Sequence, residues 1–174
     1  MPIDRTKLTS LVEIIDEKLA KHITVVAVGG TALTLLKVKT STIDIDFSFP
    51  NRDIDEFKKA LAILPKLGYR IDSFSDGDIF GITLPDDYIR KSMPIKEFKR
   101  IELRALHPID IVVTKIGRLN QRDKQDIEDT VRFFGLSESQ IANRAGQLVL
   151  AASEEQYNAN LCQLLNAIFH PQRN

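Results

Sequence analysis

The feature that most constrains this chain is the stretch from Val25 to Phe49, VVAVGGTALTLLKVKTSTIDIDFSF. It predicts an apolar strand, a Gly-Gly turn, the start of a helix, and a second strand that carries Asp44 and Asp46 between apolar neighbours. Side chains two residues apart on a strand share one face, roughly 6.5–7 Å apart. Two carboxylates on an otherwise apolar strand cost desolvation free energy unless a cation neutralises them. A divalent metal ion is the expected cation.

The glycine pair, Gly29 and Gly30, stands where the first strand ends and a helix begins. At such a turn the backbone can approach a phosphate group closely. A glycine pair alone is weak support for this, because glycines end strands in many proteins for conformational reasons. The chain lacks the third glycine of the dinucleotide-binding fingerprint and has no Gly-Lys-Ser/Thr phosphate loop. The stretch therefore indicates a metal and a phosphate in another kind of site.

Length and composition limit the possible folds, partners and kinds of site. The 174 residues, 43% of them hydrophobic, are enough for one compact domain with a core of its own. Equal numbers of basic and acidic residues, 24 of each, leave no global field that would drive the chain onto nucleic acid or a membrane. The single cysteine, Cys162, excludes an intramolecular disulfide and a thiolate zinc site. With no long apolar run and no signal-peptide pattern at the first residues, we expect a cytoplasmic protein without a membrane partner.

Hydrophobic periodicity predicts an α+β fold (α/β-like), in which a mixed β-sheet is flanked by helices. Residues 1–135 are expected to form the core with an N-terminal helix, and residues 136–174 a C-terminal helical appendage packed on the same domain. Capping boxes are expected at Ser10, Ser137 and Ser153, and Asp53 is placed to cap a helix. The predicted helices are Leu8–Leu19, Thr31–Leu36, Asp53–Leu67, one from Pro108, one ending at Gly135, and two in the tail. The predicted strands are Ile23–Val28, Ile43–Phe49, a hairpin of Tyr69–Phe74 and Ile79–Leu84, and Arg100–Leu106.

A third carboxylate would complete a two-metal site with Asp44 and Asp46. Asp72, in the run Tyr-Arg-Ile-Asp-Ser on the next predicted strand, is the first choice. Glu102, in Arg-Ile-Glu-Leu-Arg, is the competitor and has a longer side chain. Either residue could instead pair with a neighbouring arginine on the surface of the sheet.

Three basic residues follow Pro108 at helical spacing: Lys115, Arg118 and Arg122, at i, i+3 and i+7. On one helix they would share a face and could neutralise a triphosphate. The alternative is a solvated face balanced by acidic residues, namely Asp123, Asp126 and Asp129. A second basic excess, from Tyr88 to Arg104, could follow the backbone of a polynucleotide.

Taken in order, three segments resemble the nucleotidyltransferase superfamily: Gly29 to Leu33, Ser41 to Phe47, and Asp110 through Lys115 to Asp126. This is the superfamily of polymerase β and the kanamycin nucleotidyltransferases. The likeness is greatest to small prokaryotic members, the AbiEii-like toxins and the minimal nucleotidyltransferases. It covers roughly Val25 to Gly135.

The resemblance implies a role for each matching residue. The turn at Gly29 and Gly30 would hold the phosphates of a nucleotide, with Thr31 supplying a hydroxyl where many members have serine. The carboxylates would coordinate Mg²⁺ (or Mn²⁺). Lys115 would contact the triphosphate or a catalytic water. The implied metal ligands are Asp44, Asp46 and Asp72, and the implied nucleotide contacts also include Arg118 and Arg122.

The implied activity is transfer of a nucleoside monophosphate from a nucleoside triphosphate, such as ATP, to a hydroxyl group. The acceptor could be a protein, a tRNA or a small molecule, and a toxin-like member would have an antitoxin as partner. One alternative is a catalytically inactive protein of this fold that binds a nucleotide or a partner. Another is metal-assisted phosphate hydrolysis on the same carboxylates.

Overall fold

The computed structural model describes residues 2–63 and 68–171. Its main sheet has five strands in the order β5-β4-β2-β9-β8. The pairs β4–β5 and β2–β9 are parallel, whereas β2–β4 and β8–β9 are antiparallel, so the sheet is mixed, as the sequence predicts. The strands are β2 (Ile23–Ala27), β4 (Ile45–Phe49), β5 (Ile71–Ser75), β8 (Met93–Glu97) and β9 (Ile101–Ala105).

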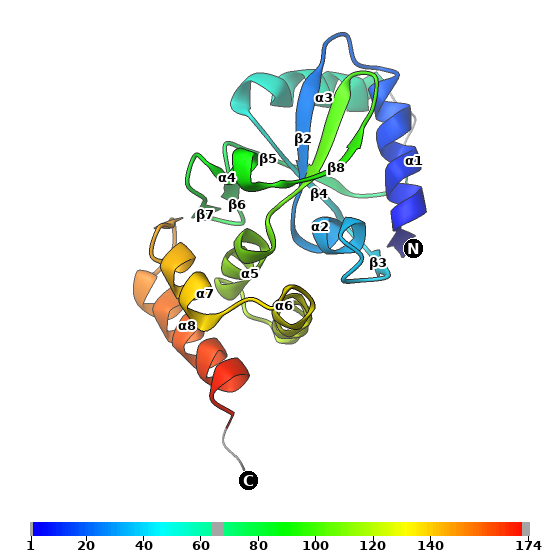
Figure 1. The fold of residues 1–174 in the computed structure, drawn as a ribbon. Coiled ribbons are helices and arrows are strands. Elements are labelled where there is room, and N and C mark those ends of the chain that lie inside the picture. Colours follow the sequence, from blue (N-terminus) through cyan, green and yellow to red (C-terminus); the bar gives the residue numbers. More distant parts are fainter. Residues whose placement is uncertain (1, 64–67, 172–174) are drawn as a thin grey trace.

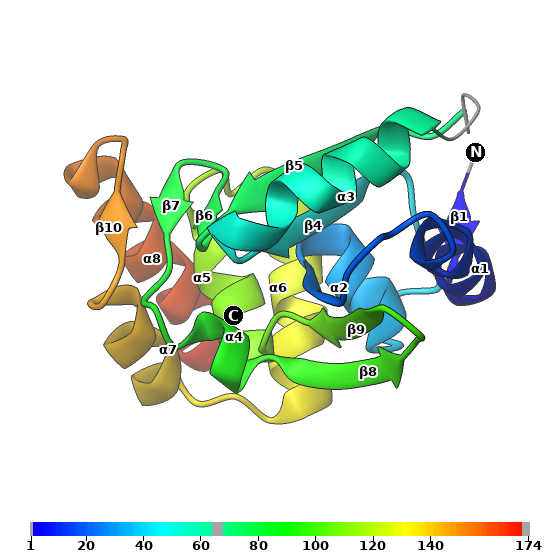
Figure 2. The same cartoon turned by 90° about the horizontal axis from the view of Figure 1, so that it is seen from above.

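Helices cover this sheet, which confirms the predicted α+β class (Figures 1 and 2). Helix α3 packs against β4 and β5, and α2 packs against β2 and β4. Helix α5 contacts both α2 and α6. All five residues of β4 are buried, the polar Asp46 and Ser48 included. The helices are α1 (Arg5–Asp16), α2 (Gly29–Leu35), α3 (Asn51–Ile63), α5 (Pro108–Ile116) and α6 (Gln121–Phe134).

The tail forms two helices, α7 (Glu138–Ala145) and α8 (Glu154–Phe169), as predicted. Both pack against α5, on the side away from the main sheet (Figure 1). The predicted capping box of α7 is present, and the Ser153 hydroxyl caps α8 by accepting from the Gln156 backbone N–H. The Tyr157 hydroxyl donates to the Val113 carbonyl over 2.9 Å and ties α8 to α5. Across residues 2–63 and 68–171, no helix has the length and apolar character needed to cross a membrane.

Two predicted helix starts are wrong. Helix α1 begins at Arg5 because Asp4 caps it by accepting from the Lys7 N–H, so Ser10 lies inside the helix. Helix α3 begins at Asn51, and Asp53 lies in its first turn. The Asp53 carboxylate instead accepts from the backbone N–H of Thr24 over 3.3 Å, which links the helix to β2. The predicted end of this helix, near residue 65, lies outside the described residues.

The predicted hairpin of Tyr69–Phe74 with Ile79–Leu84 is also wrong. Strand β5 pairs with β4, and the turn at Asp76 and Gly77, both with positive φ, directs the chain out of the main sheet. The hairpin that forms is shorter and belongs to a separate small sheet, ordered β10-β7-β6. The sequence did not predict the remaining elements, which are β1 (Ile3–Asp4), β3 (Ser41–Thr42), β6 (Asp78–Ile79), β7 (Ile82–Thr83), α4 (Tyr88–Lys91), β8 and β10 (Val149–Leu150).

Candidate functional site

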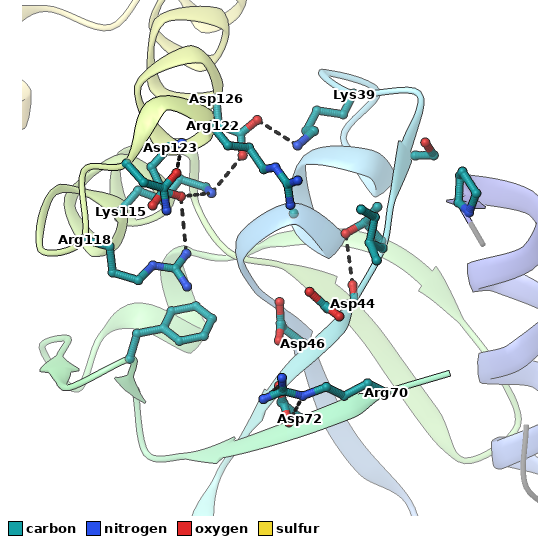
Figure 3. Close-up of a pocket in the computed structure, with 17 residues that line it drawn as sticks. Lys39, Asp44, Asp46, Arg70, Asp72, Lys115, Arg118, Arg122, Asp123 and Asp126 are labelled. Carbon is teal, nitrogen blue, oxygen red and sulfur yellow. Dashed lines mark hydrogen bonds and ion pairs between the residues drawn. The ribbon is translucent and has the colours of Figure 1, made fainter. Parts of the chain in front are cut away.

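Carboxylates from neighbouring strands meet at one cavity of about 440 Å³. Asp46 on β4 and Asp72 on β5 are partners in the parallel register, so their side chains stand on the same face of the sheet. Asp44, just before β4, lines the same cavity (Figure 3). Its volume is within the range of sites that hold small molecules. The structure therefore brings together the three carboxylates that the sequence selected first.

Asp44 and Asp46 differ from the prediction that both lie on one strand. Strand β4 begins at Ile45, so Asp44 occupies the bend that precedes it. The Asp44 side chain is exposed, whereas Asp46 is 8% exposed. Only Asp46 therefore bears the large desolvation cost that was expected of the pair.

The charge of Asp46 is unfavourable in its surroundings. Burial raises the pKa of its carboxyl from 3.8 to about 6, and the nearby charges of Asp72 and Asp44 contribute to this rise. Arg118 and Lys115 act in the opposite direction but do not reverse the shift in pKa. A cation placed among these carboxylates would relieve this repulsion, and carboxylate oxygens are the ligands that Mg²⁺ prefers.

In this arrangement the three carboxylates do not form a ready-made metal site. Among the described residues, no three His, Cys, Asp or Glu side chains form a group that could hold an ion as they stand. Arg70 pairs with Asp72, with Nε 3.2 Å from Oδ1 and Nη2 2.9 Å from Oδ2. The Arg70 side chain is 73% exposed, and exposed ion pairs contribute little to stability. A divalent ion could displace Arg70 with little loss of free energy, and three carboxylates are a donor set of the kind that Mg²⁺ prefers.

Glu102, the competing third carboxylate, does not line this cavity. It lies on β9, where it accepts from the Arg104 guanidinium and, over 3.3 Å, from the Thr24 hydroxyl. This is the pairing with a neighbouring arginine that was the alternative for either residue. Geometry favours Asp72 as the third carboxylate.

Gly29 and Gly30, which the sequence predicts as a turn, are the first residues of α2 and lie against the carboxylates. We call these two residues the glycine turn. Gly29 has a φ of +54°, and a Cβ atom added to it would be 3.4 Å from Asp46 Oδ2. A Cβ atom at Gly30 would be only 2.8 Å from Thr42 Oγ1. Strands β2 and β4 are antiparallel, so the end of one strand stands beside the start of the other. A side chain at Gly30 would clash with Thr42, whereas at Gly29 the positive φ rather than lack of space disfavours one, and the backbone of both residues is close to the cavity.

Thr31 does not face the cavity. Its side chain is fully buried, and its hydroxyl donates to the Asp44 carbonyl over 3.2 Å and accepts from the Asp46 N–H over 3.0 Å. The Thr42 hydroxyl also donates to the Asp44 carbonyl, over 3.0 Å. Thr31 thus holds the backbone that carries both carboxylates, which differs from the direct nucleotide contact implied by the resemblance.

The three basic residues do not share one helix. Helix α5 ends at Ile116, Arg118 lies in the connection, and Arg122 belongs to α6. The break arises at Asn120, whose side chain caps α6 by accepting from the Asp123 N–H over 2.9 Å. All three basic side chains nevertheless line the cavity, opposite the carboxylates of the sheet (Figure 3).

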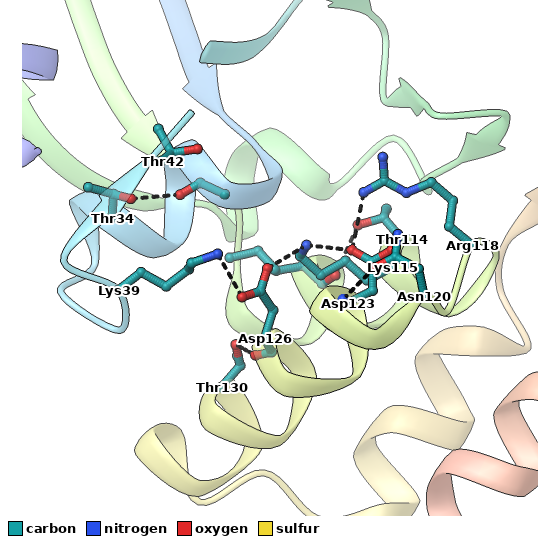
Figure 4. Close-up of polar contacts among 12 residues, drawn as sticks. Thr34, Lys39, Thr42, Thr114, Lys115, Arg118, Asn120, Asp123, Asp126 and Thr130 are labelled. Atoms are coloured by element: carbon teal, nitrogen blue, oxygen red, sulfur yellow. Dashed lines mark hydrogen bonds and ion pairs between the residues drawn. The ribbon is translucent and has the colours of Figure 1, made fainter. Parts of the chain in front are cut away.

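Lys115 lies in a buried ion network (Figure 4). Its Nζ is 2.9 Å from Asp123 Oδ1 and 2.8 Å from Asp126 Oδ2. Lys39 pairs with the other oxygen of Asp126 over 2.8 Å, and Arg118 reaches Asp123 over 3.3 Å. Lys115 is 4% exposed, so the alternative of a solvated, charge-balanced face is wrong for it and for both aspartates. The apolar sequence around Lys115 is the signal that could have predicted its burial.

Several further residues line the cavity that sequence reasoning did not assign to it, among them Lys39, Arg70, Phe80 and Asn120. The Arg118 guanidinium lies over the Phe80 ring, with Cζ 4.1 Å from the ring centroid. The basic segment from Tyr88 to Arg104 contributes no residue to the lining of this cavity in the described part of the chain. That segment includes β8, at the edge of the sheet opposite β5.

Comparison with known families places these features in context. A family model described as "Nucleotidyltransferase of unknown function (DUF6036)" matches residues 6–169. Comparisons with curated proteins and with solved structures found no match. The matched range includes the sheet, both sides of the cavity and the two tail helices.

Proposed function

This chain belongs to a family of nucleotidyltransferases of unknown function, and we propose that it transfers a nucleoside monophosphate from a nucleoside triphosphate to a hydroxyl acceptor, with Mg²⁺ (or Mn²⁺) as cofactor. One observation carries the proposal. Asp46 and Asp72 stand in register on adjacent strands, with Asp44 beside them, at a cavity whose opposite wall is basic. Carboxylates facing cations across one cavity match the needs of a metal–triphosphate complex.

The metal would be held by Asp44, Asp46 and Asp72. When bound, it would neutralise charge on the triphosphate and lower the pKa of the acceptor hydroxyl. The raised pKa of Asp46 supports this assignment, because the ionised carboxyl gains most from a nearby cation.

The protein's own groups would orient and neutralise the triphosphate. The backbone at Gly29 and Gly30 can approach the phosphates because neither residue has a side chain in the way. Arg118 and Arg122 are exposed at the basic wall, where their charges would neutralise the triphosphate, and Arg122 would contact phosphate oxygens directly. Lys115 would keep its two aspartate partners and act on the triphosphate through its charge.

Asp72 is the proposed general base for the acceptor hydroxyl. To act so, it must leave Arg70, and the exposed pair between them opens with little loss of free energy. In-line attack on the α-phosphorus then forms a new phosphoester bond, and pyrophosphate leaves with the electrons of the broken P–O bond. Such a reaction asks the protein mainly for positioning and charge.

The acceptor is proposed by class only: a protein hydroxyl, a tRNA end or a small alcohol. A tRNA or protein acceptor would suit a toxin-like member with an antitoxin. Incubation with α-labelled nucleoside triphosphates and each acceptor class separates them, because the label moves to the acceptor that is used.

The test compares transfer by the wild type and three variants. Asp44→Asn and Asp46→Asn remove a proposed metal ligand, and each is expected to lower kcat/KM at least a hundredfold. Asp55→Asn removes an exposed carboxylate of α3 that does not line the cavity, and it is expected to act as wild type. Transfer that survives Asp46→Asn undiminished would refute the mechanism.

A second candidate, nucleotide binding without transfer, is favoured by the contacts of Arg70 with both oxygens of Asp72. It predicts that nucleotide raises the unfolding temperature without any need for Mg²⁺ and that no product forms. Phosphate hydrolysis is distinguished in the same assay by release of labelled monophosphate without an acceptor.

A further inference from the structure

A bulky aromatic residue occupies an unfavourable backbone position beside the cavity. Phe80 and Gly81 form the two-residue turn between β6 and β7, with φ values of +55° and +77°. A hairpin turn with two positive φ values favours asparagine or aspartate followed by glycine. A phenylalanine there costs conformational free energy, and such strain is frequent at functional sites.

This backbone directs the Phe80 ring to the carboxylates. A Cβ atom built on Gly29 would be 3.7 Å from Phe80 Cε2 and 3.4 Å from Asp46 Oδ2. The ring is thus next to both the glycine turn and the buried carboxylate. Among the described residues that line the cavity, Phe80 is the single aromatic one, in a lining otherwise made largely of charged and polar groups.

Neighbouring residues fix the ring in place. Phe74 on β5 meets Phe80 edge to face, with ring centroids 4.8 Å apart. Arg118 lies over the ring, and its Nη2 atom is held 3.3 Å from Asp123 Oδ1. The Arg118 side chain is still 44% exposed. The guanidinium thus stacks on one face of the ring, and the two groups together form a partly open surface at the cavity, which we call the Phe80–Arg118 platform.

We propose that the Phe80–Arg118 platform stacks the nucleobase of the triphosphate substrate. Bases stack on aromatic rings and on guanidinium planes, and each such contact contributes substantially to nucleotide affinity. The platform is next to the glycine turn, and the ribose would span from the base to the phosphates held there. Stacking does not read the hydrogen-bonding edge of a base, so the platform would accept more than one base.

This inference rests on the proposed nucleoside triphosphate substrate. Its test distinguishes the contribution of the base to binding from that of the phosphates. Two probes are bound in the presence of Mg²⁺ and followed by calorimetry: α,β-methylene ATP, which cannot transfer AMP, and inorganic triphosphate, which has no base. Phe80→Asn removes the ring and suits the turn. Phe80→Tyr keeps the ring. Phe133→Ser removes an exposed aromatic side chain of α6 that does not line the cavity.

Phe80→Asn is expected to weaken binding of the ATP analogue about tenfold, the effect of losing one stacked base, and to change binding of inorganic triphosphate less than about twofold. Phe80→Tyr and Phe133→Ser are expected to bind both probes within about twofold of wild type. Because asparagine relieves the strained turn, Phe80→Asn is expected to remain folded.

Three results would overturn the platform. Phe80→Asn could bind the ATP analogue as wild type does, or it could lose both probes equally, which would make the ring a support for the glycine turn. Wild type could also bind the two probes equally well. If instead the platform is upheld but no transfer product forms with natural substrates, the proposed activity fails and the base site stands. A wild type that binds neither probe refutes both.

Discussion

Two groups of carboxylates face each other across the cavity, and they differ in the cations that neutralise them. The sheet group is Asp44, Asp46 and Asp72, and the helix group is Asp123 and Asp126 on α6. Asp46 and both helix aspartates are nearly fully buried. The helix group is neutralised by cations from three parts of the chain: Lys115, Lys39 and Arg118. Among the ion pairs of the described residues, the sheet group is reached by the exposed Arg70 alone.

The difference teaches how to separate structural from ligand-binding carboxylates. Where the protein supplies its own buried cation, the aspartates join two helices and a loop. Where it does not, the charge remains costly, and the pKa of Asp46 rises to about 6. The sheet group is therefore the one that we propose binds an external cation.

The largest expected effect is the loss of the central cation of the helix group. Lys115→Met leaves two buried aspartates partly uncompensated, so the free energy of unfolding should fall by about 3 kcal/mol. Urea unfolding measures this, with Lys124→Met on α6 as the control that changes little. A Lys115→Met protein as stable as wild type would show that the network does not hold α5 to α6.

A change in the sheet group should have the opposite sign. Asp46→Asn removes a buried charge without changing the shape of the side chain, so at pH 7.5 without metal it should raise the free energy of unfolding. The expected gain is on the order of 2 kcal/mol. A loss of stability in this variant would place Asp46 with the structural carboxylates.

The pH dependence of the free energy of unfolding tests the same difference between the sheet group and the helix group. Because the folded-state pKa of Asp46 is raised, the folded protein holds its proton more tightly than the unfolded chain. The contribution of Asp46 to the free energy of unfolding is therefore close to zero below about pH 4. It becomes unfavourable as the pH rises to about 6 and stays constant above that pH. The stability difference between Asp46→Asn and wild type should grow over this window. A difference that is flat with pH contradicts the assignment.

The smallest expected effect is at Arg70. Its pair with Asp72 is exposed, so Arg70→Gln should leave the free energy of unfolding almost unchanged. Calorimetric titration should show tighter Mg²⁺ binding, because Asp72 no longer has to leave a partner. Weaker Mg²⁺ binding in Arg70→Gln would mean that Arg70 supports the site.

Much of the site follows from local sequence. Apolar β-branched runs predict β2 and a strand from Ile43 to Phe49, most of which forms β4, and Gly29 and Gly30 mark where β2 ends and α2 begins. The alternation around Asp72 predicts a strand. These signals depend on residues close together in the chain, and they selected the three carboxylates that the fold places at one cavity.

The remainder depends on contacts distant in sequence. The register that sets Asp46 beside Asp72 is fixed only when β4 and β5 pair. The burial of Lys115 depends on α6 folding back onto α5. The placing of Phe80 depends on a turn conformation that phenylalanine disfavours, so propensity points away from it. The predicted long hairpin was wrong for a related reason, because β5 found its partner in the main sheet.

The most direct test of the contrast is the effect of Mg²⁺ on thermal unfolding at pH 7.5. At concentrations several times the dissociation constant, Mg²⁺ should raise the unfolding temperature of wild type and of Asp55→Asn by about 2–4 °C. It should leave Asp46→Asn unchanged, although that variant starts from a higher unfolding temperature. An equal rise in Asp46→Asn, or no rise in wild type, would contradict the proposal that the sheet carboxylates bind the metal ion.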